Sequence, residues 1–88
     1  MGIDIKIVGP LRFVIGPTLI YELDEATIGD IIKYLKELYE EKRGVGRPPF
    51  EEILGQLTIL VNGEKVSNAS RRVSKDDEIK IVQPVHGG

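Results

Sequence analysis

One stretch of the chain has the hydrophobic period of an α-helix, and it decides what the remaining residues can build. Its apolar residues recur at spacings of three and four, which puts them on one helical face: Ile28, Ile31, Ile32, Leu35, Leu38 and Tyr39. Thr27 precedes this stripe as a predicted N-cap, Asp30 follows three residues later as in a capping box, and Gly44 lies beyond the last apolar residue. We predict a single long helix over residues 27–43.

Strand signals lie on the N-terminal side of this helix. Residues 3–8 place isoleucine at every second position, the period of a strand with one face in a core. Residues 18–23 are rich in β-branched and aromatic side chains, and Gly-Pro pairs at 9–10 and 16–17 bracket a loop between the two segments. We predict that the two strands pair as a wide hairpin.

The C-terminal side of the helix predicts a helical turn followed by strands. Residues 45–56 contain a proline pair and a later glycine, which fits a single turn begun by proline and ended by glycine. Residues 57–61 are an apolar run of strand length, and Asn62-Gly63 is a strong hairpin signal that leads into residues 64–66. A polar turn cluster then precedes the last strand, residues 78–82.

This order predicts an α+β fold, with a mixed sheet of four to five strands and one long helix packed across one face. A right-handed crossover through the helix lets the first and last strands lie parallel at the centre of the sheet. We therefore expect one domain over residues 1–82. Residues 83–88 are expected to form a flexible tail that leaves the sheet from a central strand.

Composition excludes several functions. With 12 basic residues, 14 acidic residues and a formal charge of −2, the chain has no basic field that would gather nucleic acid. It has no cysteine, which excludes a disulfide framework, a thiolate zinc site and a catalytic thiol. The N-terminus lacks the continuous apolar run of a signal peptide or membrane span, so we expect a cytoplasmic protein with no membrane partner.

Two kinds of side chain suggest site chemistry but have simpler explanations. Adjacent carboxylates such as Asp76-Asp77 point in different directions on regular elements, so we expect a turn there and no metal or cofactor. His86 can titrate near neutral pH, but the sequence positions no acid or hydroxyl group beside it. We predict that His86 is a tail residue that contacts a partner.

The sequence ends on Gly87-Gly88, after a short segment that follows the last predicted strand. Glycines have no Cβ, so such a tail can enter a narrow channel and bring a terminal carboxylate against a partner's reactive atoms. Pro84 ends the strand because it has no N–H to donate. The alternative interpretation is a frayed end without function.

Together these residues resemble a known family. The predicted element order, the Asn62-Gly63 hairpin, the turn at 75–78 and the segment 83–88 are similar to the ubiquitin-like β-grasp sulfur carriers, most closely to the small subunit of molybdopterin synthase. His86 departs from the family pattern, in which a small residue usually precedes the glycines, and Gln83 stands where proline is often found.

The resemblance implies a mechanism at Gly88. In that family a ubiquitin-activating-like adenylyltransferase uses ATP to adenylate the C-terminal carboxylate, and a sulfur donor protein converts the acyl-adenylate to a thiocarboxylate. In the molybdopterin case the loaded tail enters the large synthase subunit and gives its sulfur to a pterin precursor. This chain has no Gly-rich phosphate loop of its own, so ATP would be held by the partner. The chain would be a carrier and not an enzyme.

A partner-binding surface follows from strand alternation. If the isoleucines of the first and last strands face the helix, Val8, Leu60 and Val82 point to the opposite face, where the family has its apolar docking patch. The tail residues that would enter the partner are Pro84, Val85, His86 and Gly87. Arg71 and Arg72 are candidates for ion pairs with an acidic activating enzyme.

Three alternatives remain open at the level of sequence. The chain could be a ubiquitin-like modifier, joined through Gly88 to lysines of target proteins. It could be a sulfur carrier for thiamine synthesis, although the insertion at 45–56 makes it long for that group. It could also be a β-grasp interaction domain whose function would survive loss of Gly88.

Overall fold

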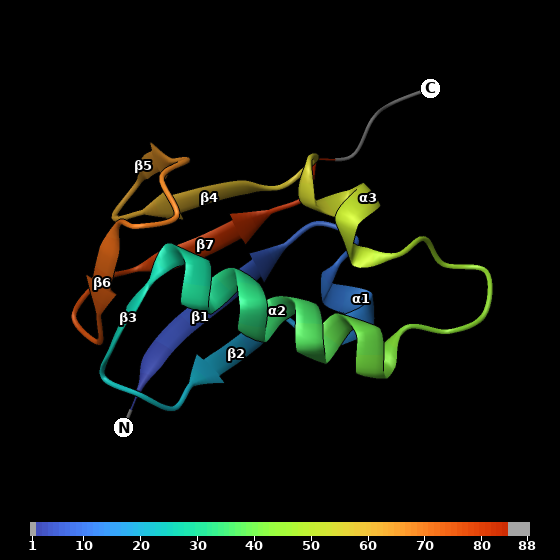
Figure 1. Ribbon diagram of the computed structural model, residues 1–88, viewed down its shortest axis with the longest axis horizontal. Helices are drawn as coiled ribbons and strands as arrows, with labels where there is room; N and C mark the ends of the chain where they lie inside the picture. Colours follow the sequence, from blue (N-terminus) through green and yellow to red (C-terminus); the bar gives the residue numbers. More distant parts are fainter. Residues whose placement is uncertain (1, 85–88) are drawn as a thin grey trace.

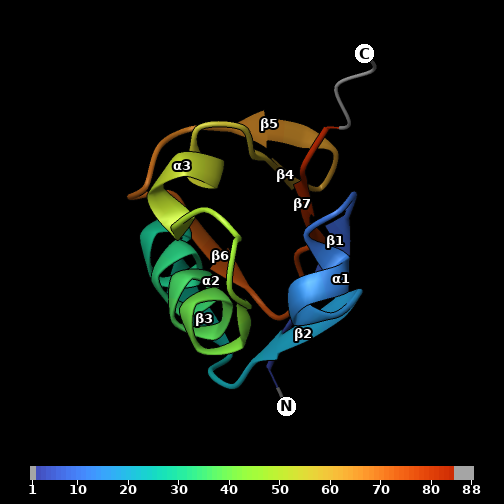
Figure 2. The ribbon, with the colours of Figure 1, turned by 90° about the vertical axis from the view of Figure 1, so that its right-hand side faces the viewer.

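The fold is a mixed sheet curled around one long helix. The computed structural model describes residues 2–84. In chain order its elements are β1 (Ile3–Val8), α1 (Arg12–Ile15), β2 (Thr18–Tyr21), β3 (Glu25–Thr27), α2 (Ile28–Lys42), α3 (Phe50–Leu54), β4 (Thr58–Val61), β5 (Glu64–Val66), β6 (Arg72–Ser74) and β7 (Ile79–Val82). Figure 1 shows α2 crossing one face of the main sheet, and Figure 2 shows the sheet bending around that helix.

The main sheet has the strand order β2-β1-β7-β4-β5. Its central pair, β1 and β7, is parallel, with Ile5 opposite Ile79 and Val8 opposite Val82. The other neighbours pair antiparallel. A parallel pair needs a long crossover, which the segment containing α2 supplies. The predicted α+β architecture and its parallel centre are confirmed.

Helix α2 begins and ends where the stripe predicts. The Thr27 N–H donates to Asp30 Oδ2 at 3.0 Å, and the Asp30 N–H donates to Thr27 Oγ1 at 3.1 Å, so both halves of the capping box are present. These hydrogen bonds, the backbone one first, hold the pKa of Asp30 below its ordinary value. The capping box thus fixes the start of α2 at Ile28.

The core lies between α2 and the inner face of the sheet. Every second residue of β1 and β7 is buried, and its alternate neighbours face outward. Ile3, Ile5, Ile31, Val61 and Ile81 have no exposed surface. At Asn62-Gly63 both residues have positive φ, 53° and 85°, as a two-residue hairpin turn with the favoured twist requires.

The segment between α2 and β4 is fastened to the helix. As predicted, it contains one short helix, α3, which follows Pro49 and ends at Gly55. The Tyr39 hydroxyl donates to the Pro48 carbonyl at 2.7 Å, and the Phe50 N–H donates to a carboxylate oxygen of Glu40 at 3.1 Å. This insertion is therefore an ordered part of the domain.

Three local expectations were wrong. The segment 9–17, expected to be a loop, contains α1, and the strand expected over 18–23 ends at Tyr21. Strands β3 and β6 were not predicted and form a separate antiparallel ribbon. Each of these two strands has three residues and buries only one, Ala26 or Val73, so neither is long enough to display a period of two.

No helix within residues 2–84 combines the length and the apolarity that crossing a bilayer requires.

Candidate functional site

The candidate site is the end of β7 from which the tail leaves. Strand β7 is held by β1 on one side and β4 on the other. The ladder continues one residue beyond it, because the Gln83 N–H donates to the Val8 carbonyl at 2.9 Å. Pro84 is exposed, and as a proline it donates no further backbone hydrogen bond. Gln83 is thus the last residue that the sheet holds by a backbone hydrogen bond within residues 2–84.

Gly9 fixes the direction of this exit. Its φ is +100°, which side chains with a Cβ rarely adopt, and a Cβ built on it would overlap the carbonyl oxygen of Gln83. Gly16 has nearly the same backbone angle, +96°, but a Cβ there would meet no atom within 4 Å. The two Gly-Pro pairs that bracket the loop therefore differ, since only Gly9 lets another segment approach closely.

An apolar strip lies beside the exit, on the face of the sheet away from α2. We call Val8, Leu60 and Val82 the apolar strip. Val8 and Val82 are opposite each other in the β1–β7 register, and Val8 is 39% exposed. Leu60 lies one register row further from the exit and, like Val82, is half-buried. The predicted outward direction of all three side chains agrees with the observed register, while their docking role stays a prediction.

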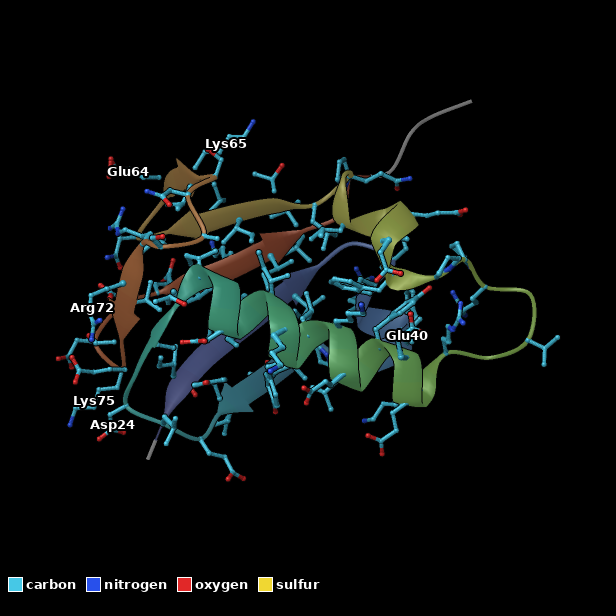
Figure 3. The ribbon with its side chains drawn as sticks, viewed as in Figure 1. Asp24, Glu40, Glu64, Lys65, Arg72 and Lys75 are labelled. Carbon is cyan, nitrogen blue, oxygen red and sulfur yellow. The ribbon has the colours of Figure 1, made fainter. Side chains whose placement is uncertain are left out.

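The remaining predicted residues lie elsewhere. Arg71 and Arg72 are exposed on and beside β6, and Figure 3 shows Arg72 at the opposite end of the molecule from α3 and the end of β7. They are thus separate from the apolar strip. The residues Val85, His86, Gly87 and Gly88 lie outside the described residues, so their predicted roles are not tested by geometry.

The start of β7 is tied to the β4–β5 hairpin. The Asn62 side-chain amide donates to Asp77 Oδ1 at 2.9 Å, and its carbonyl oxygen accepts from the Glu78 N–H at 2.8 Å. The second Asp77 oxygen accepts from the Ser74 N–H at 2.8 Å. The hydrogen bond from Asn62, followed by that from Ser74, holds the pKa of Asp77 below its ordinary value. β7 is therefore anchored at both ends.

The described residues have little room for a small-molecule site next to the exit. A hollow of about 80 Å³ lies there, lined in part by Leu11, Tyr39 and Gln83, and it is much smaller than a typical cofactor pocket. A hollow of about 480 Å³ lies by the start of β7, but its lining includes Asp4 and Lys75 and does not reach the exit. Within residues 2–84 no group of three or more potential metal ligands converges.

Two features of this face were not predicted from the sequence. Gly9 was interpreted only as a loop boundary, although its place directly after a predicted strand that neighbours the last strand was a usable signal. Lys6 and Lys80 were given no role from the sequence, yet they are opposite each other in the β1–β7 register. The proximity of these two lysines can be deduced only when the register between β1 and β7 is known.

The fold and the exit together define a class of protein. A mixed sheet with a parallel central pair, wrapped around one helix and ending on a central strand, is the ubiquitin-like β-grasp fold. The sequence profile of the ThiS family matches residues 5–88, and the chain belongs to this family.

Solved structures with the same fold include SAMP1 and molybdopterin converting factor subunits. SAMP1 from Haloferax volcanii is 22% identical, with all of each chain covered and a TM-score of 0.70. The putative molybdopterin converting factor subunit 1 from Pyrococcus furiosus is 23% identical, with 97% of this chain and 99% of that chain covered and a TM-score of 0.70. The complex of molybdopterin-converting factor subunits 1 and 2 from Helicobacter pylori gives 23% identity, full coverage of both chains and a TM-score of 0.58.

At this level of identity the three structures establish the fold. No curated protein sequence matches the chain significantly.

Proposed function

We propose that the chain is a sulfur carrier for molybdopterin synthesis, and that the carboxylate of Gly88 is its reactive group. The observation that carries the proposal is the exit: a Gly-Gly tail follows a central strand that is anchored at both ends, beside the exposed apolar strip. Membership of the ThiS family supports it. Molybdopterin is preferred as the pathway because two structural neighbours are named molybdopterin converting factor subunits.

The chemistry requires a partner because a carboxylate is a poor electrophile. A ubiquitin-activating-like adenylyltransferase binds ATP, a carboxylate oxygen of Gly88 bonds to the α-phosphorus, and pyrophosphate leaves. A persulfide on a sulfur donor protein then attacks the acyl carbon and AMP leaves, and a thiol cleaves the S–S bond of the resulting acyl disulfide, which leaves a thiocarboxylate on Gly88. The chain itself supplies an accessible carboxylate and a surface that places it, and it works as a carrier subunit.

Each predicted residue has a part in this scheme. The apolar strip docks on the activating enzyme and later on the large synthase subunit. Pro84 directs the tail away from the sheet, and Val85, His86 and Gly87 contact the channel walls. Arg71 and Arg72 make a second contact with the activating enzyme at a distance from the tail.

The test is intact mass spectrometry of the protein recovered from its own cells. The proposal predicts that the C-terminal peptide gains the mass difference between sulfur and oxygen. A variant lacking Gly88 serves as the control and gains nothing. An unmodified wild-type protein, together with unchanged function of the truncated variant, would show that the tail is incidental and that the domain acts through its surface alone.

A second candidate function has one observation in its favour. A structure from Haloferax volcanii that covers 94% of this chain, with a TM-score of 0.64, is described as small archaeal modifier protein 1. A modifier would form an amide between Gly88 and lysines of target proteins. In the same experiment this function predicts Gly88-dependent adducts on other proteins and no sulfur on the free chain.

A further inference from the structure

The outer face of the sheet carries a row of lysines next to the apolar strip. The strand register places Lys6 opposite Lys80, Lys80 opposite Leu60, and Leu60 opposite Lys65. These four residues lie on neighbouring strands about 5 Å apart and form one row across β1, β7, β4 and β5. Figure 3 shows Lys65 projecting on the side away from α2. We call Lys6, Lys80 and Lys65 the lysine row.

This arrangement is unfavourable for the isolated domain. Lys6 and Lys80 lie side by side on adjacent strands, where like charges repel each other, whereas Leu60 separates Lys80 from Lys65. Among residues 2–84 neither Lys6 nor Lys65 is within salt-bridge distance of a carboxylate, and Lys80 reaches only Glu78, at 3.8 Å. The chain has more acidic than basic residues, so carboxylates for neutralising the row are not scarce. Folding alone therefore does not explain the pairing of Lys6 with Lys80.

The polarity of the face changes in order toward the exit. The next row consists of Val8, Val82 and Thr58, two residues along the strands and about 7 Å nearer the tail. On the far side of the lysine row lie Asp4 and Glu78, both exposed. From the exit, the first row is apolar at Val8 and Val82, the second is basic apart from Leu60, and the third is acidic. Such a sequence of surfaces fixes the orientation in which the partner can dock.

We infer that the lysine row binds a row of carboxylates on the adenylating partner, placed about 7 Å beyond that partner's own apolar contact. The inference rests on the proposed function, since it names the partner chemistry at the same docking face. Nucleic acid does not fit this surface, because three lysines border an apolar strip on a chain with a net charge of −2. An acidic protein surface satisfies both the charges and the apolar residues beside them.

The test compares two double variants with the same loss of charge. Lys6→Gln with Lys80→Gln removes charge from the lysine row, whereas Lys33→Gln with Lys42→Gln removes it from the exposed side of α2. The measurement is ATP–pyrophosphate exchange by the adenylating enzyme of this class from the same cells, as a function of carrier concentration. Substitution in the lysine row should raise KM roughly three- to tenfold with kcat unchanged. The α2 variant should match the wild type.

The dependence of KM on ionic strength tests the same contact independently. Raising the ionic strength should raise the KM of the wild type more than that of the lysine-row variant, since exposed charge contacts are screened. Equal KM values for both double variants, or a loss of kcat in place of a rise in KM, would overturn the inference.

A separate measurement keeps this inference distinct from the proposed function. If the wild-type chain is not adenylated at all, the proposed function fails, and the surface is then tested by NMR titration with a synthetic peptide of alternating leucine and glutamate. Shifts concentrated at the amides of Lys6, Lys80 and Leu60, and absent in the lysine-row variant, would support an acidic partner. Shifts elsewhere or none would refute it.

Discussion

The two faces of the main sheet are built from alternate residues of the same strands, but they differ in burial and in charge. On the inner face Ile5, Ile7, Ile79 and Ile81 are buried against α2. On the outer face their neighbours, Lys6, Val8, Lys80 and Val82, include paired lysines and exposed valine. Packing accounts for the inner face. The outer face places two lysines side by side, an arrangement that packing does not explain.

The two faces should differ most in the stability that is lost when a side chain of β7 is shortened to alanine. Ile81→Ala empties a fully buried site and should lower the free energy of unfolding by about 2–5 kcal/mol. Val82→Ala, the adjacent residue on the outer face, is half-buried and should cost about 1 kcal/mol or less. Urea unfolding of both variants measures the difference. Equal losses would mean that the outer face is as much a core as the inner one.

Gly9 follows β1 and lies directly against Gln83, the residue after β7, at the border of the outer face. Gly16 provides a matched control. Alanine at either site meets backbone strain of about 1–2 kcal/mol, because φ is close to +100° at both. Gly9→Ala should cost more than Gly16→Ala, since its Cβ also displaces Gln83. Hydrogen exchange should show lost protection of the Gln83 N–H in Gly9→Ala only. Unchanged protection of the Gln83 N–H would show that Gly9 does not fix the position of Gln83.

The turn that begins β7 should contribute a pH-dependent part of stability. Hydrogen bonds lower the folded pKa of Asp77 below its ordinary value of 3.8, so its contribution is complete above about pH 4 and is lost as the pH falls through the folded pKa. Asp77→Asn should therefore be less stable than wild type at neutral pH, and the gap should narrow on acidification. Thermal unfolding from pH 7 to 2 measures this.

Asp76→Asn is the control for that titration, because within residues 2–84 the Asp76 carboxylate makes no hydrogen bond, whereas Asp77 makes two. The control should follow the wild-type curve. A constant gap between Asp77→Asn and wild type at every pH would contradict the assignment to the carboxylate.

The smallest expected effect is a gain in stability, and it concerns the lysines of the outer face. Lys6→Gln relieves repulsion with Lys80 without removing the contact between Lys80 and Glu78, and should stabilise the domain at low salt by a few tenths of a kcal/mol. The gain should vanish at high salt, where the charges are screened. Urea unfolding at two ionic strengths measures it. Destabilisation by Lys6→Gln at low salt would show that the lysine row already suits the free domain.

The parts of the fold that could be predicted are those whose pattern is long enough to repeat. Helix α2 shows its stripe over three turns, and β1 and β7 show alternation with isoleucine. α1, β3 and β6 span three or four residues and depend on tertiary contacts, so local sequence could not reveal them.

The candidate site likewise has features that a local pattern predicts and features that depend on contacts between distant segments. The apolar strip follows from alternation within single strands, so Val8, Leu60 and Val82 could be placed in advance. The role of Gly9 depends on Gln83, and the lysine row on the register of four strands. Both features join segments more than 70 residues apart in sequence, and no local pattern encodes such pairing.

The most direct test of the central claim is the mass of the C-terminal peptide in four proteins recovered from the same cells: wild type, the variant lacking Gly88, Lys6→Gln with Lys80→Gln, and Lys33→Gln with Lys42→Gln. The account predicts exchange of oxygen for sulfur in wild type and in the α2 variant, a smaller modified fraction in the lysine-row variant, and none without Gly88. A wild-type peptide that carries no sulfur would contradict it.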